Sequence, residues 1–201
     1  MKTLPYLFLL MVLFSRHTIA QKDKTMYNSF PERQLTIEPG LGIHTNFGTD
    51  ILFTNLIQRN LTRHLSLGAH SSFNINNITQ RDFNFIKTEY NYSFNQKFGI
   101  GTSFYAKRSS HSFFFMAGAK YTAYKDTLDH PDLEKVNSTV SAWSPDYGMM
   151  YSLKRGVKDL FFSFRLYIPL YPWPMKGSNI DYIDANRDNI ALEAGIGIKI
   201  K

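Results

Sequence analysis

The sequence predicts an all-β fold: an eight-stranded antiparallel up-and-down β-barrel that spans a membrane with its strands. Apolar and polar residues alternate with a period of two over long stretches, which is typical of strands with two unlike faces. Eight such stretches of about ten residues or more fit a tilted crossing of a bilayer. The predicted connections at one end of the strands are mostly long and those at the other end are short, which is typical of such barrels.

The N-terminal residues predict export. Lys2 precedes the apolar run 4–14, and small residues at Thr18 and Ala20 precede Gln21, which together indicate a cleaved signal peptide over residues 1–20. The apolar run has 11 residues, fewer than the roughly 20 that a spanning helix needs. The polar, aperiodic residues 21–34 predict a periplasmic lead-in, and residues 35–201 predict the barrel.

Composition excludes several classes of site. The chain has no cysteine, so neither a disulfide nor a thiolate metal site can form. Removing Lys2 and Arg16 with the signal peptide leaves 21 basic and 16 acidic residues, a net charge of +5. The charges are scattered, without the clustering of a nucleic-acid groove. We therefore expect no nucleic-acid partner, no metal and no cofactor.

Four strands are predicted in the first half. In the first, Leu41 and Ile43 lie on the apolar face and Gly42 and His44 on the polar face. The same alternation recurs in the next three, and the four predicted ranges are 35–47, 61–75, 84–94 and 98–107. A tight hairpin at Asn95–Lys97 is predicted between the third and the fourth, and the residues between 47 and 61 are predicted to form a loop.

Four more strands are predicted in the second half, at 111–124, 137–153, 159–170 and 189–200. The first of these is less regular, because Phe114 and Met116 fall on its polar face. Pro145 interrupts the second, which makes it the weakest of the eight. In the last strand, Ile196 and Ile198 alternate with glycines.

The polar face indicates which side points inward, because it combines glycines with charged residues. Glycine weakens a solvated strand, but in a narrow lumen small residues leave room for large ones. Tyr and Phe recur near the strand ends, where a membrane interface would lie. We therefore predict that the apolar face meets lipid; a secreted, soluble, lipocalin-like barrel with its apolar face inward is the alternative. The predicted lumen charge network is Glu38, Lys87, Glu89, Lys120, Arg165 and Glu193.

The sequence resembles the small eight-stranded outer-membrane β-barrel family, OmpA/OmpX-like and of the Bacteroidota type, over residues 35–201. The resemblance rests on the strand pattern, on the strand end at 167–172 (YIPLYP) and on the closing segment 191–198 (ALEAGIGI). It implies location in the cell outer membrane, with outer-membrane lipids, lipopolysaccharide and the barrel-insertion machinery as partners. Many members end in an aromatic residue, whereas this sequence ends in Ile200 and Lys201.

The predicted lumen charges could line an ion path or form a paired network that fills the barrel. An eight-stranded lumen is just wide enough to be packed by side chains, so we predict the network and no wide pore. Glu38 and Glu193 lie on the first and last strands, which meet when the barrel closes. They should therefore approach each other and need Arg165 or Lys199 as partners.

Histidines offer few catalytic or metal-binding arrangements. His64 and His70 are about 20 Å apart along a strand and cannot share an ion, although His44 could approach one of them. His70-Ser71-Ser72 matches the His-x-Ser pair of lipid A deacylases, so a lipid-modifying enzyme is a further alternative. Both residues fall on the polar face, however, as does the nearest acid, Glu89. We therefore expect no enzyme.

The predicted outer loops, 125–136 and 172–188, are the remaining candidates for contact. The second contains Trp173, Tyr182 and Ile183. Loops commonly carry function on rigid scaffolds. The sequence thus predicts a non-enzymatic outer-membrane barrel with a structural or surface-binding role, exerted on an extracellular ligand or surface partner through its loops.

Overall fold

The computed structural model is a closed barrel of eight antiparallel strands, in which each strand pairs with the next and β1 pairs with β8. It describes residues 34–44, 51–75, 86–106, 108–129, 131–132, 134–156, 159–170 and 190–200. The strands are β1 (Leu35–His44), β2 (Ile51–Asn60), β3 (Leu65–Ile75), β4 (Ile86–Tyr105), β5 (Ser109–Leu128), β6 (Val136–Gly156), β7 (Leu160–Pro169) and β8 (Ala191–Ile200). Within these ranges no helix has the length and apolarity to cross a membrane. The predicted signal peptide, 1–20, and residues 21–33 of the lead-in lie outside the described residues.

The predicted number of strands is confirmed, but β2 occupies a segment that was predicted to be a loop. Its side chains do not alternate between apolar and polar. Leu52 and Leu56 point into the barrel and are buried, whereas Ile51 and Phe53 point outward. A strand that is apolar on both faces lacks the period-two pattern by which the others were predicted.

The predicted strands 84–94 and 98–107 form one strand, β4, so the hairpin predicted at Asn95–Lys97 is wrong. The polar run at Asn95, Gln96 and Lys97 was interpreted as a turn. In the structure these residues pair without interruption with β3 on one side and with β5 on the other. Gln96 simply points outward, while its two neighbours point into the barrel.

With these strand positions, long and short connections alternate along the whole barrel. At one end of the barrel the connections are long, at 45–50, 76–85, 129–135 and 170–190. At the other end they are short, at 61–64, 106–108 and 157–159. We call these the long-connection end and the short-turn end. Long loops at one end and tight turns at the other are typical of membrane barrels.

The predicted orientation of the two faces is confirmed. Inward side chains are mostly polar, and Glu38 and Arg165 are completely buried. Outward side chains are mostly apolar and exposed, reaching 71% for Phe162, 63% for Phe98 and 57% for Leu41. A soluble barrel has the opposite arrangement, because its core is the apolar side.

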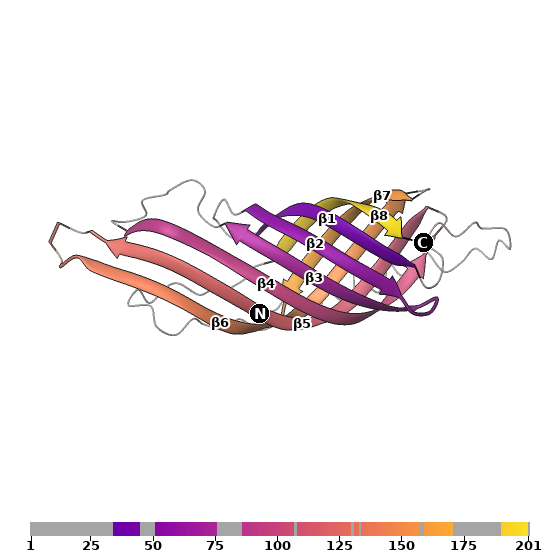
Figure 1. Cartoon of the computed structure of the whole chain (residues 1–201), viewed down its shortest axis with the longest axis horizontal. Coiled ribbons are helices and arrows are strands. Elements are labelled where there is room, and N and C mark those ends of the chain that lie inside the picture. Colours follow the sequence, from indigo (N-terminus) through magenta and orange to yellow (C-terminus); the bar gives the residue numbers. More distant parts are fainter. Residues whose placement is uncertain are drawn as a thin grey trace, which may run out of the picture.

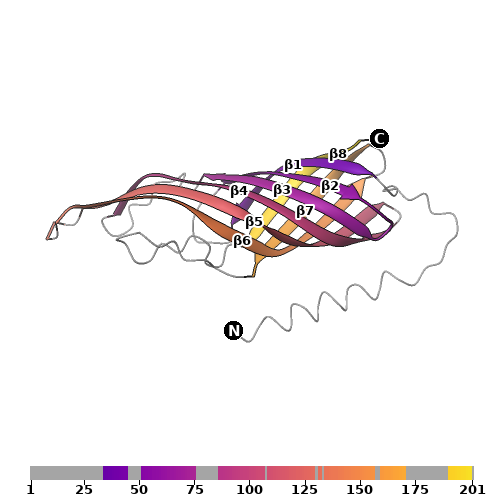
Figure 2. The ribbon, with the colours of Figure 1, turned by 60° about the horizontal axis from the view of Figure 1, so that its bottom comes forward.

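Three neighbouring strands extend beyond the others at the long-connection end (Figures 1 and 2). β4, β5 and β6 have 20, 20 and 21 residues, whereas the remaining strands have 10 or 11. β3 pairs with β4 only up to Tyr92, and β7 pairs with β6 only from Gly148. Residues 86–91, 124–128 and 136–140, which pair with one another beyond the last partners in β3, therefore form a three-stranded sheet outside the ring, here called the projecting sheet.

Candidate functional site

Most of the buried charged side chains lie in the lumen, which is therefore the candidate site. Seven of them are each no more than 6% exposed: Glu38, Lys97, Lys120, Asp146, Lys154, Arg165 and Glu193. A buried charge is tolerated when it is paired and hydrogen-bonded. Their contacts divide these residues into three groups, one after another along the barrel axis.

The group closest to the short-turn end is centred on Lys154. Its Nζ forms an ion pair with Glu38 and donates a hydrogen bond to Thr36 Oγ1 at 2.9 Å. Thr36 Oγ1 in turn donates to Glu38 Oε1 at 2.8 Å. Lys154 also lies 5.4 Å from the centre of the Phe161 ring. Lys154 was not among the predicted lumen charges, because the strand was predicted to end at residue 153, whereas β6 continues to Gly156.

The middle group is centred on Arg165, which pairs with the carboxylate of Glu193 as expected, whereas the carboxylate of Glu38 pairs with Lys154. Arg165 Nε is 2.9 Å from Glu193 Oε2, and its Nη1 donates to the backbone carbonyl of Glu38 at 2.8 Å. His70 Nε2 contacts the same Glu193 carboxylate at 3.0 Å. A Cβ atom on Gly40 would be 2.5 Å from Arg165 Nη2, so the glycine makes room for the guanidinium.

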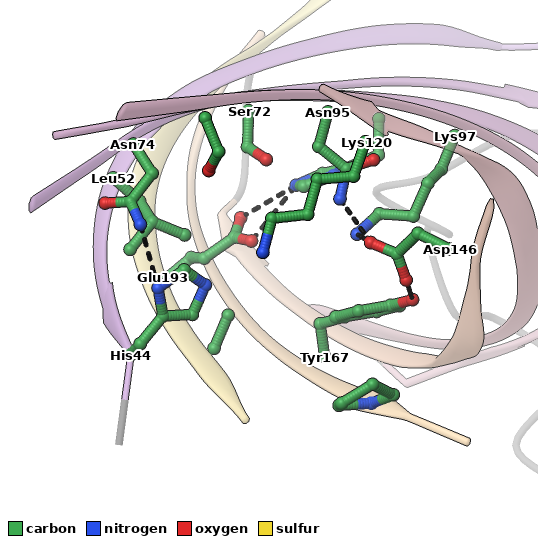
Figure 3. Close-up of a pocket in the computed structure, with 14 residues that line it drawn as sticks. His44, Leu52, Ser72, Asn74, Asn95, Lys97, Lys120, Asp146, Tyr167 and Glu193 are labelled. Atoms are coloured by element: carbon green, nitrogen blue, oxygen red, sulfur yellow. Dashed lines mark hydrogen bonds and ion pairs between the residues drawn. The ribbon is translucent and has the colours of Figure 1, made fainter. Parts of the chain in front are cut away.

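The third group lies toward the long-connection end, because Tyr167 is near the end of β7 that leads into the connection 170–190. Figure 3 shows this group in close-up. Lys97 Nζ donates to Asp146 Oδ2 at 3.1 Å, and both Tyr167 and Asn95 donate hydrogen bonds to the same carboxylate. Lys97 Nζ also lies 3.5 Å from the centre of the Tyr167 ring. Lys120 points into the cavity between these side chains (Figure 3). Lys97 and Asp146 were missed because they lie in the predicted hairpin and beside Pro145.

Two residues of the predicted network lie outside the lumen. Glu89 is in the projecting sheet, where its side chain is 53% exposed and forms an ion pair with Lys125 at 2.7 Å. Lys87 is in the same part of β4, and its side chain lies outside the described residues. Both were predicted to point into the lumen because of alternation, but β4 has left the ring at this point. The predicted loop contacts Trp173, Tyr182 and Ile183 also lie outside the described residues.

The three histidines considered for a metal site are dispersed. His64 lies in the turn between β2 and β3, with Nδ1 3.1 Å from the carbonyl oxygen of Ser103. His44 Nδ1 is 3.2 Å from Asn74 Nδ2 near the long-connection end, and His70 contacts Glu193. In the described part of the chain, no group of three His, Asp or Glu residues is arranged to hold a metal ion.

The His-x-Ser pair of the enzyme alternative faces the lumen, where His70 and Ser72 are both buried. The acid beside His70 is Glu193. Glu89, which was predicted to be the nearest acid, lies in the projecting sheet. An acyl chain in a bilayer would lie on the other side of the barrel wall. The pair is therefore placed for a structural contact and not for attack on a lipid.

Apolar side chains fill much of the remaining lumen. Phe114 and Met116, the two exceptions on the polar face of β5, pack with residues of four other strands; the buried cluster comprises Leu52, Leu56, Phe114, Met116, Met150, Tyr167 and Ala191. The cavity beside Lys97 and Lys120 has a volume of about 20 Å³. That is roughly the space one water molecule requires. Buried charges and the apolar cluster thus occupy the lumen, with little free space beside Lys97 and Lys120.

Aromatic side chains frame the exposed apolar surface of the barrel. On the short-turn side, the Phe113 ring lies 4.9 Å from that of Tyr151 and 6.4 Å from that of Phe104. On the long-connection side, the Tyr121 and Trp143 rings are 5.3 Å apart. From Phe113 to Tyr121 β5 rises about 26 Å. At a tilt of about 40° this corresponds to a height of roughly 20 Å, close to the apolar band of membrane barrels, about 25 Å.

No protein-family model matches the sequence, and no curated protein matches it. Among solved structures, Ail, the attachment invasion locus protein of Yersinia pestis, is 8% identical, with a TM-score of 0.45, over 83% of this chain and 97% of that chain. Neisserial surface protein A (NspA) is 9% identical, with a TM-score of 0.42, over 84% of this chain and 94% of that chain. The resemblance to barrels of the Bacteroidota type remains a prediction.

Proposed function

We propose that the chain is a non-enzymatic outer-membrane barrel of a Gram-negative cell envelope that presents the projecting sheet at the cell surface as a binding element. The observation that carries this proposal is the exterior of the barrel. Its outward side chains are apolar and exposed, and aromatic rings border them on both sides. A contiguous apolar surface of this kind would be a severe aggregation liability in water, but it matches a bilayer.

The long-connection end faces the outside of the cell in this proposal. Outer-membrane barrels have short periplasmic turns and longer extracellular loops, and both termini lie on the periplasmic side. The predicted signal peptide supplies the export that this placement requires. The segment containing Trp173, Tyr182 and Ile183 connects β7 to β8 at the same end, where it would add to the exposed contact surface.

The projecting sheet has an open edge along β6. Among the described strands, only β5 pairs with residues 136–147, because the pairing of β6 with β7 starts at Gly148. Leu170 N donates to the Tyr147 carbonyl at 3.1 Å, so the backbone of Tyr147 points away from β5. Alternate residues of a strand share this direction, so the N–H groups of Thr139 and Ser141 point to the open edge.

The same alternation explains Pro145. Its nitrogen, which carries no hydrogen, points away from β5, so the ladder between β5 and β6 loses no hydrogen bond. Proline is found on strand edges of this kind, where it also discourages uncontrolled pairing. The rest of the edge could accept an extended segment of a partner polypeptide as an additional strand, with backbone hydrogen bonds supplying the affinity.

Membrane placement can be tested with single cysteines, because the chain has none of its own. Thr139→Cys in the projecting sheet should react with a membrane-impermeant maleimide on intact cells. Arg108→Cys is the matched control, because Arg108 is exposed at the short-turn end and should react only after the outer membrane is permeabilised. Equal labelling of both positions on intact cells, or recovery of the protein in the soluble fraction, would contradict the proposed placement.

Strand addition can be tested with a random peptide library selected against the barrel in lipid vesicles. Selected peptides should lose binding to Ser141→Pro, which removes one edge N–H, and should keep binding to Ser141→Ala, which removes only the hydroxyl. Pro145 indicates that this side of β6 accommodates proline. Peptides that bind both variants equally well would assign the contact to another part of the surface.

A further inference from the structure

The apolar exterior is interrupted by a row of polar and small residues. Successive cross-strand partners on β1 to β6 all point outward along this row, here called the polar row: Pro39, Asn55, Ser71, Gln96, Ala119 and Pro145. None of them is a large apolar residue. Ser71 Oγ donates a hydrogen bond to Gln96 Oε1 at 2.5 Å.

The rows on either side differ sharply from it. Toward the long-connection end the next outward row contains only large side chains, namely Leu41, Phe53, Phe73, Phe94, Tyr121 and Trp143. On the other side, Phe98 is 63% exposed and lies between the cross-strand partners Ala69 and Ala117. The polar row therefore lies inside the apolar band and not at its border.

A polar side chain in hydrocarbon destabilises the protein unless its donors and acceptors form hydrogen bonds. Asn55 Oδ1 is buried among the outward side chains and has no hydrogen-bond partner among the described residues. Hydrocarbon offers it none, and the carboxamide NH₂ groups of Asn55 and Gln96 also require acceptors. At contacts between transmembrane helices, polar side chains form hydrogen bonds and small residues allow close approach. The same physical reasons apply to two barrel walls in contact.

We infer that the polar row is the lateral contact between two copies of this chain in the membrane. Asn55, Ser71 and Gln96 each carry both a donor and an acceptor, so the row is complementary to itself across a two-fold axis. The small side chains of Ala69, Ala117 and Ala119 leave space beside Phe98 for the corresponding ring of the second copy. The inference rests on the proposed membrane placement.

Cysteine cross-linking in lipid vesicles tests this contact. Ala119→Cys lies in the polar row, whereas Ala194→Cys is an equally small, outward position on β8, on the other side of the closed sheet. With a membrane-permeable oxidation catalyst, Ala119→Cys should form dimers at least tenfold faster than Ala194→Cys at the same protein-to-lipid ratio. Equal rates for the two folded proteins would overturn the inference.

A second pair of variants tests the hydrogen bonds. Combined with Ala119→Cys, the changes Asn55→Leu and Gln96→Leu should lower dimer formation at least fivefold. The control Thr102→Leu also replaces an outward polar residue of β4, outside the row, and should leave dimer formation unchanged. If Gln96→Leu instead released a tightly bound lipid, detected by native mass spectrometry, without altering dimer formation, the row would be a lipid site and the inference would be wrong.

Vesicle flotation separates this inference from the proposed function. Variants that float with the vesicles and show heat-modifiable migration on gels are inserted and folded, so absence of dimers in that fraction counts against the polar row alone. Failure of the unmodified chain to float would contradict the membrane placement itself.

Discussion

Arg165 Nε lies 2.9 Å from Glu193 Oε2 in the middle of the lumen, and neither side chain is exposed. The same guanidinium donates to the Glu38 carbonyl and to Thr54 Oγ1 at 2.9 Å. One side chain of β7 therefore binds residues of β1, β2 and β8. These contacts connect strands across the closed barrel, in addition to the backbone ladders.

Replacing Arg165 tests how much this pairing stabilises the fold. Arg165→Met leaves the buried Glu193 carboxylate with His70 as its remaining close partner, and we expect the free energy of unfolding to fall by about 3–5 kcal/mol. Urea unfolding in lipid vesicles measures it. In the double variant Arg165→Met/Glu193→Gln, part of the loss should be recovered because neither charge remains. Strictly additive losses would contradict a direct coupling of the two groups.

Gly197 is required by the Phe161 ring, which occupies the lumen beside it. The three atoms nearest to a Cβ at position 197 all belong to that ring, and they are too close for it. We expect Gly197→Ala to lower the free energy of unfolding by about 1–3 kcal/mol. Adding Phe161→Leu should restore part of that stability, because the smaller side chain frees the space. A double variant less stable than both single variants would show that the glycine serves another purpose.

The packed lumen predicts that the barrel does not conduct ions. Seven buried charges and an apolar cluster fill it, and the cavity beside Lys97 has room for about one water molecule. Planar bilayer recordings of the folded protein should show no discrete conductance steps under conditions in which an open porin does. Reproducible single-channel steps that change amplitude in Arg165→Met would reveal an ion path through this network.

The barrel class and the two faces could be predicted because both follow from local alternation. Glycines and charges on one face indicated a narrow lumen, and Gly40 beside Arg165 shows the expected packing. β2 could not be predicted in this way. Leu52 and Leu56 belong to the apolar cluster inside the lumen, which forms only when distant strands such as β5 and β6 close around it.

The lumen network was predicted only in part. Glu38, Arg165 and Glu193 lie on regular strands and are buried in the lumen, where Arg165 pairs with Glu193 and binds the backbone of Glu38. Lys97 and Lys154 were missed because their segments looked like a turn and a strand end. Glu89 was placed inside because alternation reveals which face a residue is on, but not where a strand leaves the barrel. That point depends on the lengths of β3 and β7, the neighbours of the long strands.

The outward orientation of the apolar face is the central claim, and the fluorescence of a single tryptophan tests it directly. The chain has two tryptophans, so replacing Trp143 and Trp173 with Phe provides a background for new positions. Phe115 points outward and is 52% exposed, while its neighbour Phe114 points into the lumen and is buried. In vesicles with brominated acyl chains, the fluorescence of Phe115→Trp should be strongly quenched and that of Phe114→Trp should be nearly unaffected. Equal quenching at the two positions, or none at either, would contradict this orientation.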